Sequence, residues 1–302
     1  MANKKASTYF HRLKNAVLIF VEKLILKPFI KEVEIHDTET TLLHILKNKC
    51  SVSRYGDGEL NQSWSKYNIG FQQHNLELSK KLRDLLHNST NAPNHIICLP
   101  FPYNETKHLT ARAASFWIKL RIKHKLLYFK KLPRIQYFDT QCTRLYMDYA
   151  DKSKTEHFFN IWKQIWHDQN VCIIEGVKSR LGVGNDLFNT ARSLKRILVP
   201  EANAFNVYDK ILNAAVENCS KTDLILLAIG PTATVLSFDL AKMGYWAIDI
   251  GHIDIEYEWF KMNAAKKTAI SNKYVNEVAF AGSECILDGE YENSIIAKIE
   301  AE

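Results

Sequence analysis

Asp57 and Glu59 stand two residues apart, with Gly56 before the first carboxylate and Gly58 between the two. The glycines carry no side-chain bulk, so the backbone can turn sharply and bring both carboxylates toward a bound group. Two hard oxygen ligands close to Arg54 suit a divalent cation, Mg²⁺ or Mn²⁺, that bridges to a phosphate. An acid–glycine–acid sequence also occurs in ordinary surface turns. The motif therefore predicts either a metal site or a plain turn.

A second loop, residues 176–186, follows the apolar run 171–174 and is rich in glycines and hydrogen-bond donors. Glycines at a strand end free backbone N–H groups to meet an anion. The loop matches neither the dinucleotide fingerprint nor the Walker loop. A glycine turn before a helix is the alternative, but it explains the Ser-Arg and Asn-Asp residues less well. We predict nucleotide contacts from Ser179, Arg180, Gly182, Gly184, Asn185 and Asp186.

A third loop, residues 230–234, follows the apolar run 224–229 and reads Gly-Pro-Thr-Ala-Thr. Proline is well placed in the first turn of a helix, where free backbone N–H groups and the helix dipole can hold a phosphate. We therefore predict that Thr232 and Thr234 contact the same ligand. Ordinary helix initiation explains the segment equally well.

The segment 246–259 concentrates acids and one histidine just after another apolar run. In an extended chain, His252, Asp254, Glu256 and Glu258 would line one side. If a helix begins near Asp254, then Asp254 and Glu258 share a face instead. We predict a general base here, first Asp254 or Glu256 and then His252. A half-buried strand with a solvated face is the alternative.

The rest of the chain alternates short apolar runs with longer helical patterns. This alternation predicts an α/β fold, a mostly parallel sheet with helices on both faces, whose function gathers where strands end. Asp37 is a capping residue for a short helix through Leu46. The further apolar runs are 96–99, 171–174, 196–199, 224–229 and 246–250, and the helical patterns are 76–88, 110–129, 156–168, 206–218 and 232–243.

Composition and cysteine use are those of an ordinary globular protein. Of the 302 residues, 46% are hydrophobic and 24% are charged, which excludes a disordered chain. The six cysteines are scattered and form no Cys-x-x-Cys pair, so we expect buried free thiols in a reducing compartment. No signal peptide with a cleavage site and no apolar span of about 18 residues is visible. We therefore expect a cytoplasmic protein.

The net charge of +7 is concentrated in two amphipathic segments, residues 8–30 and 119–134. Such segments can lie on the anionic inner face of the cell membrane as peripheral contacts. Packing of both segments on the chain's own domain is the alternative, and we favour it slightly. Because no recognised nucleic-acid module is present, we do not expect a nucleic-acid partner.

Three of these motifs, 54–59, 179–188 and 230–234, together with the segment 251–259, resemble the bacterial GT-D glycosyltransferases in order and spacing. The likeness covers roughly residues 35–290. That family was first catalogued as a domain of unknown function found with surface-glycan and adhesin glycosylation genes.

The resemblance implies a Rossmann-like GT-D domain over residues 35–302, after an N-terminal helical extension over residues 1–34. It also implies metal-dependent transfer of a sugar from a nucleotide sugar, typically UDP-linked, to a glycan or glycoprotein in surface polysaccharide or adhesin glycosylation. The family's Asp-x-Glu metal motif falls on Asp57 and Glu59, which would hold Mn²⁺ or Mg²⁺. Arg54 and Arg180 could then bind phosphate oxygens in a bidentate manner.

Two other functions remain open from the sequence. A metal-dependent phosphohydrolase of a nucleotide or sugar phosphate would use the same loops with water as acceptor, although such sites commonly gather more metal ligands. A non-catalytic scaffold that binds nucleotide sugars, or docks on a membrane, would use the basic segment 119–134 and the N-terminal helix for docking. The intact metal and phosphate positions argue against such a loss of activity.

Overall fold

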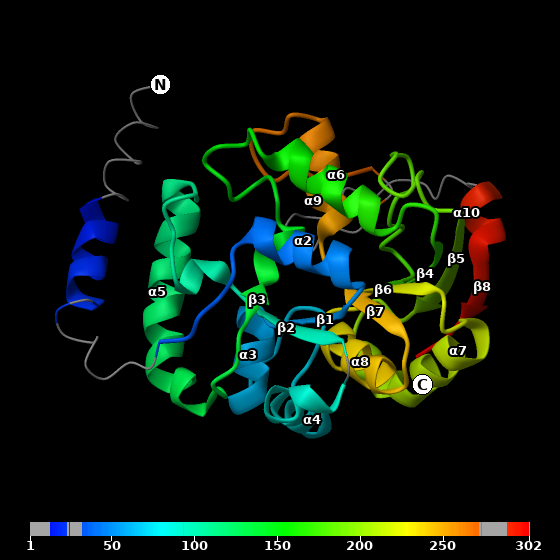
Figure 1. Ribbon diagram of the computed structural model, residues 1–302, viewed down its shortest axis with the longest axis horizontal. Helices are drawn as coiled ribbons and strands as arrows, with labels where there is room; N and C mark the ends of the chain where they lie inside the picture. Colours follow the sequence, from blue (N-terminus) through cyan, green and yellow to red (C-terminus); the bar gives the residue numbers. More distant parts are fainter. Residues whose placement is uncertain are drawn as a thin grey trace.

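The computed structural model describes residues 13–22, 24, 32–92, 94–271, 273 and 289–301. Its centre is one eight-stranded sheet with the order β3-β2-β1-β7-β6-β4-β5-β8 (Figure 1). Every paired strand runs parallel to its neighbours. The strands are β1 Ser51–Arg54, β2 His95–Leu99, β3 Phe138–Asp139, β4 Asn170–Gly176, β5 Ser193–Val199, β6 Leu224–Ala228, β7 Trp246–Asp249 and β8 Ile295–Lys298.

Helices cover both faces of this sheet, as the sequence predicted (Figure 1). Helices α2, α6 and α9 lie over one face, and α3, α4, α7 and α8 lie over the other, with α5 beyond the β3 edge. The α-helices are α2 Thr38–Asn48, α3 Asp57–Trp64, α4 Leu76–His87, α5 Ala111–Leu127, α6 Thr155–Ile165, α7 Tyr208–Asn218, α8 Pro231–Lys242, α9 Ile253–Lys261 and α10 Gly289–Ser294.

Alternating side chains along the strands build the two cores. In β6, Leu224 and Leu226 join the core under α2 and α6, whereas Ile225 and Leu227 join the core under α4 and α8. Successive residues of a strand point to opposite faces, so a strand buried on both faces reads as a continuous apolar run. This is why the apolar runs in the sequence correctly predicted β2, β4, β5, β6 and β7.

Two strands that the sequence did not predict, β3 and β8, lie at the two edges of the sheet. Strand β3 has two residues, and β8 pairs with β5 in a C-terminal segment where no apolar run predicted a strand. The predicted cap of α2 is confirmed, because the Asp37 Oδ1 accepts a hydrogen bond from the Thr40 N–H at 2.8 Å. Helix α9 begins at Ile253. Of the two arrangements predicted for the acids of the segment 246–259, the structure therefore shows the helical one.

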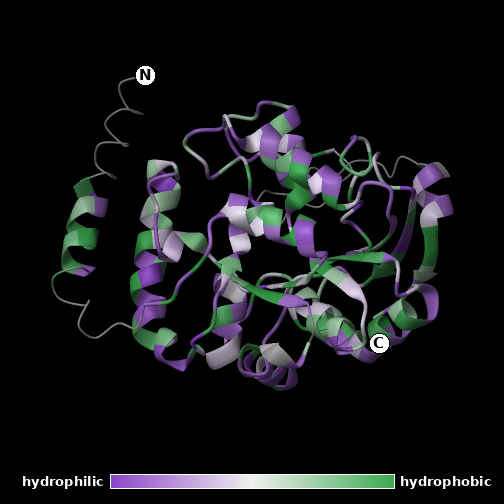
Figure 2. Cartoon of the chain, viewed as in Figure 1, coloured by the Kyte–Doolittle hydropathy of each residue, from purple (hydrophilic) through white to green (hydrophobic). Residues whose placement is uncertain are grey.

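The amphipathic segment near the N-terminus forms a helix over residues 13–21 that packs along α5 (Figures 1 and 2). Glu22 pairs with Arg121 and, at 3.4 Å, with Lys125, and all three side chains are buried. Part of the basic segment 119–134 therefore packs on the chain's own fold. The rest of the predicted helix 8–30 lies outside the described residues, apart from residues 22 and 24. The boundary between residues 1–34 and 35–302 stays a prediction.

Strands β1 and β7 lie side by side in the middle of the sheet, but their chains continue on opposite faces. Strand β1 leads to α3, whose Leu60 joins one core, and β7 leads to α9, whose Ile253 joins the other. Adjacent strands that diverge in this way leave a crevice at their carboxyl ends, where ligands bind in α/β proteins. The fold therefore places its site at the ends of β1 and β7.

Among the described cysteines, Cys50, Cys98, Cys142, Cys172 and Cys219 are buried and free. Cys285 lies outside the described residues. Within the described ranges, no helix is both long and apolar enough to cross a membrane.

We expect the fold to lose stability in mild acid because two histidines are buried in neutral form. Burial lowers the pKa of His124 from 6.5 to about 4 and that of His95 from 6.5 to about 3. Below pH 6.5 the unfolded chain binds protons that the folded chain does not. Each histidine should therefore lower the free energy of unfolding by about 2 kcal/mol between pH 7 and pH 5.

Urea unfolding at several pH values measures this loss. His124→Asn keeps an acceptor for the Tyr103 hydroxyl, which contacts His124 Nδ1 at 2.6 Å. The variant should show a shallower decrease of unfolding free energy between pH 7 and pH 5 than the unmodified chain. An unchanged slope would contradict the assignment.

Candidate functional site

A cleft of about 1020 Å³ opens at the carboxyl ends of β1, β4, β6 and β7. This volume is at the upper end of what small-molecule and cofactor sites occupy. The cleft is lined by charged, aromatic and backbone groups from several loops that are far apart in the sequence. Its polar and charged lining residues are Arg54, Asp57, Glu59, Thr110, Arg112, Thr140, Gln141, Arg144, Asp148, Ser179, Glu201, Asp249, His252, Asp254, Lys266 and Lys267.

Asp57 and Glu59 both line this cleft from the first turn of α3. Glu59 forms a capping box, in which its Oε2 accepts a hydrogen bond from the Gly56 N–H at 2.9 Å. Burial, with the nearby negative charges of Asp249 and Asp57, raises the pKa of Glu59 to about 7. The first turn of a helix favours carboxylates, so the structure keeps two acids together at the end of β1.

Arg54, which ends β1, is held within the protein by Asp249 at the end of β7. Its Nη2 donates to Asp249 Oδ1 at 2.7 Å, and its Nε donates to the Asp249 carbonyl oxygen at 2.8 Å. A third contact runs from Arg54 Nη1 to Thr143 Oγ1 at 2.5 Å. Most of the guanidinium is therefore bound internally. Through these hydrogen bonds Arg54 connects β1, β7 and the segment after β3 at the floor of the cleft.

Gly251 lets Arg54 reach this position. Its φ of +44° lies in the left-handed region, and a Cβ there would stand 1.9 Å from Arg54 Nη2. Glycine alone meets both requirements, because it has no Cβ and adopts positive φ freely. The close approach of backbone and guanidinium thus depends on the sequence at this one position.

Gly251→Ala should destabilise the fold by about 2–3 kcal/mol, through both backbone strain and displacement of Arg54. Gly244→Ala is a matched control, since Gly244 has a φ of +82° but no atom within 4 Å of its would-be Cβ. The control should cost only about 1 kcal/mol. Chemical denaturation of both variants measures the difference, and equal losses would show that the Arg54 contact is unimportant.

The second predicted loop enters the cleft through Ser179, while its remaining predicted residues lie elsewhere. Glu175 is buried and anchors the loop, accepting from Arg196 Nη1 at 2.5 Å and from the Leu181 N–H at 2.8 Å. Arg180 does not line the cleft, because its guanidinium stacks on the Tyr291 ring at 4.9 Å. Sequence reasoning did not find these long-range partners.

Gly182, Gly184, Asn185 and Asp186 also lie outside the cleft lining. The Gly182 N–H and Asn185 Nδ2 both donate to Asp254 Oδ1 at 2.8 Å. Asp186 pairs with Lys163 and accepts from the Tyr257 hydroxyl. The backbone amides expected to meet an anion therefore meet a carboxylate of α9 instead, and the loop fixes that helix in place.

Thr232 and Thr234 are fully buried at the start of α8 and do not line the cleft. Thr234 Oγ1 donates to the Arg54 carbonyl oxygen at 2.9 Å, which ties α8 to the end of β1. Gly230, just before α8, is the residue of this loop that faces the cleft. Their predicted ligand contacts stay predictions that this arrangement does not itself display.

The three candidate bases are separated by the helical geometry of α9. His252 and Asp254 line the cleft, whereas Glu256 is buried, with its Oε2 accepting from the Tyr146 and Met147 N–H groups. Asp254 also accepts from Lys273 Nζ at 2.7 Å through Oδ2. Asp254 and Glu258 share one face of the helix, since both accept from Asn185 Nδ2.

Several residues that line the cleft were not predicted as site residues from the sequence. Asp249 is the last residue of an apolar strand, and this position at the active edge of the sheet was the signal that could have found it. Arg144 and Arg112 come from irregular or helical segments without a strand-end signal. Lys266 and Lys267 follow α9 and bring two further cations to the cleft.

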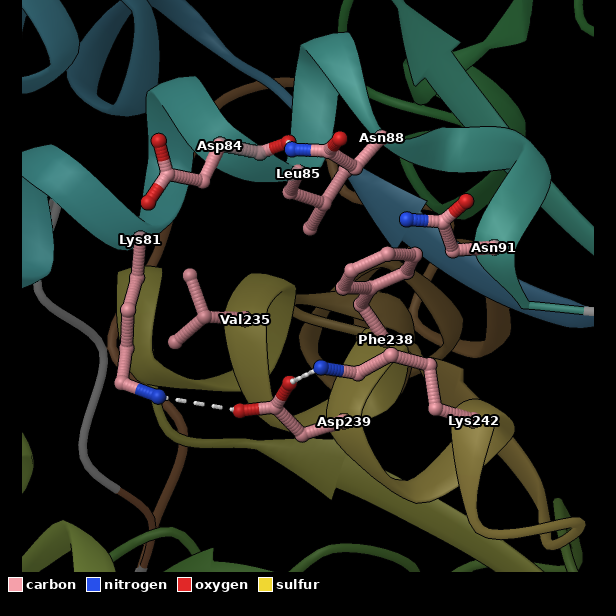
Figure 3. A pocket seen from close by; sticks show the side chains of 9 residues that line it. All are labelled: Lys81, Asp84, Leu85, Asn88, Asn91, Val235, Phe238, Asp239 and Lys242. Carbon is pink, nitrogen blue, oxygen red and sulfur yellow. Dashed lines mark hydrogen bonds and ion pairs between the residues drawn. The ribbon is translucent and has the colours of Figure 1, made fainter.

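A smaller cavity of about 360 Å³ lies between α4 and α8, on the α4 side of the sheet (Figure 3). Lys81 of α4 pairs with Asp239 of α8 across it at 3.1 Å, and Lys242, on the same helix as Asp239, pairs with it at 2.6 Å. Asp239 further accepts from the Tyr208 hydroxyl at 2.5 Å. Because these charges satisfy one another, this cavity does not rival the large cleft as a functional site.

Comparison with known proteins identifies the family to which this fold belongs. The family model for the glycosyltransferase GT-D fold matches residues 52–278, which include the strand-end loops described above. The chain belongs to this family. The match confirms the family, fold class and enzyme class that the sequence predicted.

Solved structures and curated relatives agree with this membership. The structure described as "The highly conserved domain of unknown function 1792 has a distinct glycosyltransferase fold" superposes with a TM-score of 0.84 at 37% identity, covering 89% of this chain and 96% of that one. "A New Glycosyltransferase (DUF1792) from Streptococcus sanguinis" superposes with a TM-score of 0.83 at 36% identity, covering 89% of this chain and 100% of that one.

Two curated relatives are similar over nearly all of this chain. "Probable glycosyl transferase Gly" of Streptococcus gordonii is 36% identical over 93% of the chain and 41% of the relative. "Glycosyltransferase GlyD" of Streptococcus pneumoniae is 35% identical over 94% of the chain and 35% of the relative. The chain therefore spans less than half the length of either relative.

Proposed function

We propose that this GT-D chain transfers a sugar from a UDP-linked donor to a glycan or glycoprotein acceptor, with Mn²⁺ or Mg²⁺ as cofactor. The observation that carries the proposal is the position of Asp57 and Glu59 at the β1–β7 crevice, inside a cleft of about 1020 Å³. Such a cleft can enclose a nucleotide sugar and part of an acceptor. Acceptors in bacterial surface polysaccharide or adhesin glycosylation would suit the family.

The residues at the start of α3 fit a divalent cation. Glu59 and Asp57 supply hard oxygen ligands. Burial first, and then the nearby charges of Asp249 and Asp57, raise the pKa of Glu59 to about 7, and a bound cation would favour its charged form. Among the described residues, no group of three or more His, Cys, Asp or Glu side chains is close enough to hold a metal. Phosphate oxygens of the donor and water would complete the ligand set, as is usual for Mg²⁺.

A divalent cation held by Asp57 and Glu59 would offset negative charge on the departing nucleoside diphosphate. Cationic side chains on the cleft wall can bind the remaining phosphate oxygens, with Arg112, Arg144, Lys266 and Lys267 as candidates. Arg54 supports the site from below, since Asp249 and Thr143 occupy its N–H groups. With these partners, Arg54 would not clamp phosphate with its whole guanidinium.

For the acceptor side, His252 and Asp254 are the candidates that reach the cleft. Both Asp254 oxygens already accept hydrogen bonds, from the Gly182 N–H, Asn185 and Lys273. His252 lies near Arg144, whose Nη2 is 3.5 Å from His252 Nδ1. An acceptor hydroxyl would be oriented between His252 and Asp254. Glu256 would act only by fixing the backbone at Tyr146 and Met147.

Turnover of UDP-sugars tests the proposal directly. The purified chain is incubated with UDP-glucose, UDP-galactose and UDP-N-acetylglucosamine, with Mn²⁺ or with a chelator, and UDP release is followed by chromatography. We expect release from at least one donor that depends on the cation and rises when glycan acceptors are added. Donor binding without turnover over a broad acceptor panel would favour the scaffold function instead.

The phosphohydrolase alternative gains no support from the described part of the chain, where the metal ligands number fewer than three at any one place. It makes a distinct prediction in the same experiment. Release of free phosphate from nucleoside monophosphates, without transfer to any acceptor, would favour hydrolysis over glycosyl transfer.

A further inference from the structure

The outward face of the N-terminal helix is apolar along its whole described length. Leu13, Val17, Phe20 and Leu24 are 57%, 56%, 63% and 66% exposed. They recur at intervals of four, three and four residues, so they form one stripe on the helix surface. We call these four residues the N-terminal stripe. Such a contiguous apolar stripe on a surface helix calls for a partner.

The opposite face of the same helix is fixed to α5. Leu18 and Ile19 pack against the core, and the Ser115 hydroxyl donates to Asn15 Oδ1 at 2.6 Å. Glu22 forms a buried ion pair with Arg121. Breaking a buried ion pair is costly because it leaves an uncompensated charge. The helix is therefore held with its N-terminal stripe directed outward.

Helix α5 and the segment after it add positive charge beside this stripe. Residues 111–134 include no acidic residue, and the two cations paired with Glu22 are buried. Lys14 and Lys119 lie close enough that the charge of Lys14 lowers the pKa of Lys119. The exposed cations of this surface are Arg112, Lys119, Lys123, Lys130, Lys131 and Arg134.

The basic surface also carries exposed apolar residues and reaches the cleft. Phe116, Leu126 and Leu127 are 51%, 45% and 50% exposed on α5. Phe116 and Arg112 line the cleft as well. An apolar and cationic surface therefore runs from the N-terminal stripe along α5 to the cleft mouth.

We propose that the N-terminal stripe and the exposed cations of residues 111–134 form a docking surface for an anionic lipid bilayer. Apolar side chains would enter the boundary between headgroups and acyl chains, while lysines contact anionic headgroups. The position of Arg112 and Phe116 would then hold the cleft mouth close to the membrane. This inference does not depend on the proposed sugar transfer.

The positive charge of this surface favours an anionic bilayer, rather than a second copy of this chain, as its partner. Two copies that met through this surface would bring like-charged lysines together, and like charges across an interface oppose association. An anionic membrane surface offers the complementary charge and takes up an apolar stripe at the same time. Glu22, the acid within residues 13–24, is buried in its pair with Arg121.

Sedimentation with lipid vesicles tests the docking surface on the whole 302-residue chain. We expect binding to phosphatidylcholine vesicles that contain phosphatidylglycerol, little binding to phosphatidylcholine alone, and weaker binding as salt is raised. Val17→Ser/Phe20→Ser and Lys119→Glu/Lys123→Glu should each lower the partition coefficient at least about tenfold. UDP affinity in solution should be unchanged in both variants.

Matched controls remove exposed apolar or positively charged side chains elsewhere on the surface. Leu76→Ser removes a leucine that is 76% exposed, and Lys47→Glu/Lys80→Glu reverses two exposed lysines on α2 and α4. These controls should keep most of the vesicle binding, and thermal unfolding should confirm that every variant folds. Failure of the unmodified chain to bind anionic vesicles would overturn the proposal. So would a dimer that Val17→Ser/Phe20→Ser dissociates in the absence of vesicle binding.

Discussion

Replacement of Asp57 by asparagine is expected to lower kcat/KM for sugar transfer by about a hundred- to a thousandfold. The side chain keeps its shape and its place in the first turn of α3, but it loses the negative charge that a divalent cation requires. Transition-state stabilisation by the cation would weaken, whereas the fold would not. Glu59→Gln should act in the same direction while preserving an acceptor for the Gly56 N–H.

Steady-state kinetics with saturating Mn²⁺ measure this effect, with thermal unfolding as a check on folding. Asp209→Asn is a matched control, since Asp209 is also a first-turn carboxylate, on α7. It should retain nearly full activity, because Asp209 does not line the cleft. Full activity of Asp57→Asn would remove the metal from our account of this site.

Replacement of Asp249 by alanine should lower the free energy of unfolding by about 3–5 kcal/mol. The Arg54 and Asp249 side chains are only 11% and 5% exposed and meet at 2.7 Å. Without Asp249, the Arg54 guanidinium is left buried with an uncompensated charge. Loss of the ordered strand ends should also weaken donor binding.

Two comparisons isolate the buried charge in urea unfolding. Asp249→Asn keeps an oxygen for Arg54 Nη2 and should be less damaging than Asp249→Ala. Arg192→Ala breaks the exposed pair with Asp168, whose side chains are 57% and 61% exposed, and should be far less destabilising because water already screens that pair. If Asp249→Ala were no more destabilising than Arg192→Ala, the Arg54–Asp249 pair would not organise the cleft floor.

Much of the architecture follows from local patterns. Strands such as β6 are buried on both faces, so their sequences are continuous apolar runs that mark them clearly. Strand β3 has two residues, and β8 is a half-buried edge strand whose residues alternate in burial. Neither gives a long apolar run, and tertiary pairing with β2 and β5 decides their conformation.

The candidate site was predictable only where one loop acts alone. Asp57 and Glu59 reach the cleft because they directly follow β1, and the carboxyl ends of parallel strands share an edge. The loop around Gly182 is different, since its donors bind Asp254, which is 72 residues away in the sequence. Arg54 likewise finds Asp249 at a separation of 195 residues. Local sequence reveals donors and acceptors but not which of them will satisfy one another.

Isothermal titration of the purified chain with UDP, with and without Mn²⁺, tests the central claim most directly. The same titration is repeated on the Asp57→Ala/Glu59→Ala variant. We predict UDP binding that Mn²⁺ strengthens markedly and that the double variant loses, with the variant still folded. UDP binding that is absent with Mn²⁺ present, or that survives unchanged in the double variant, would contradict a UDP-sugar site built on these two carboxylates.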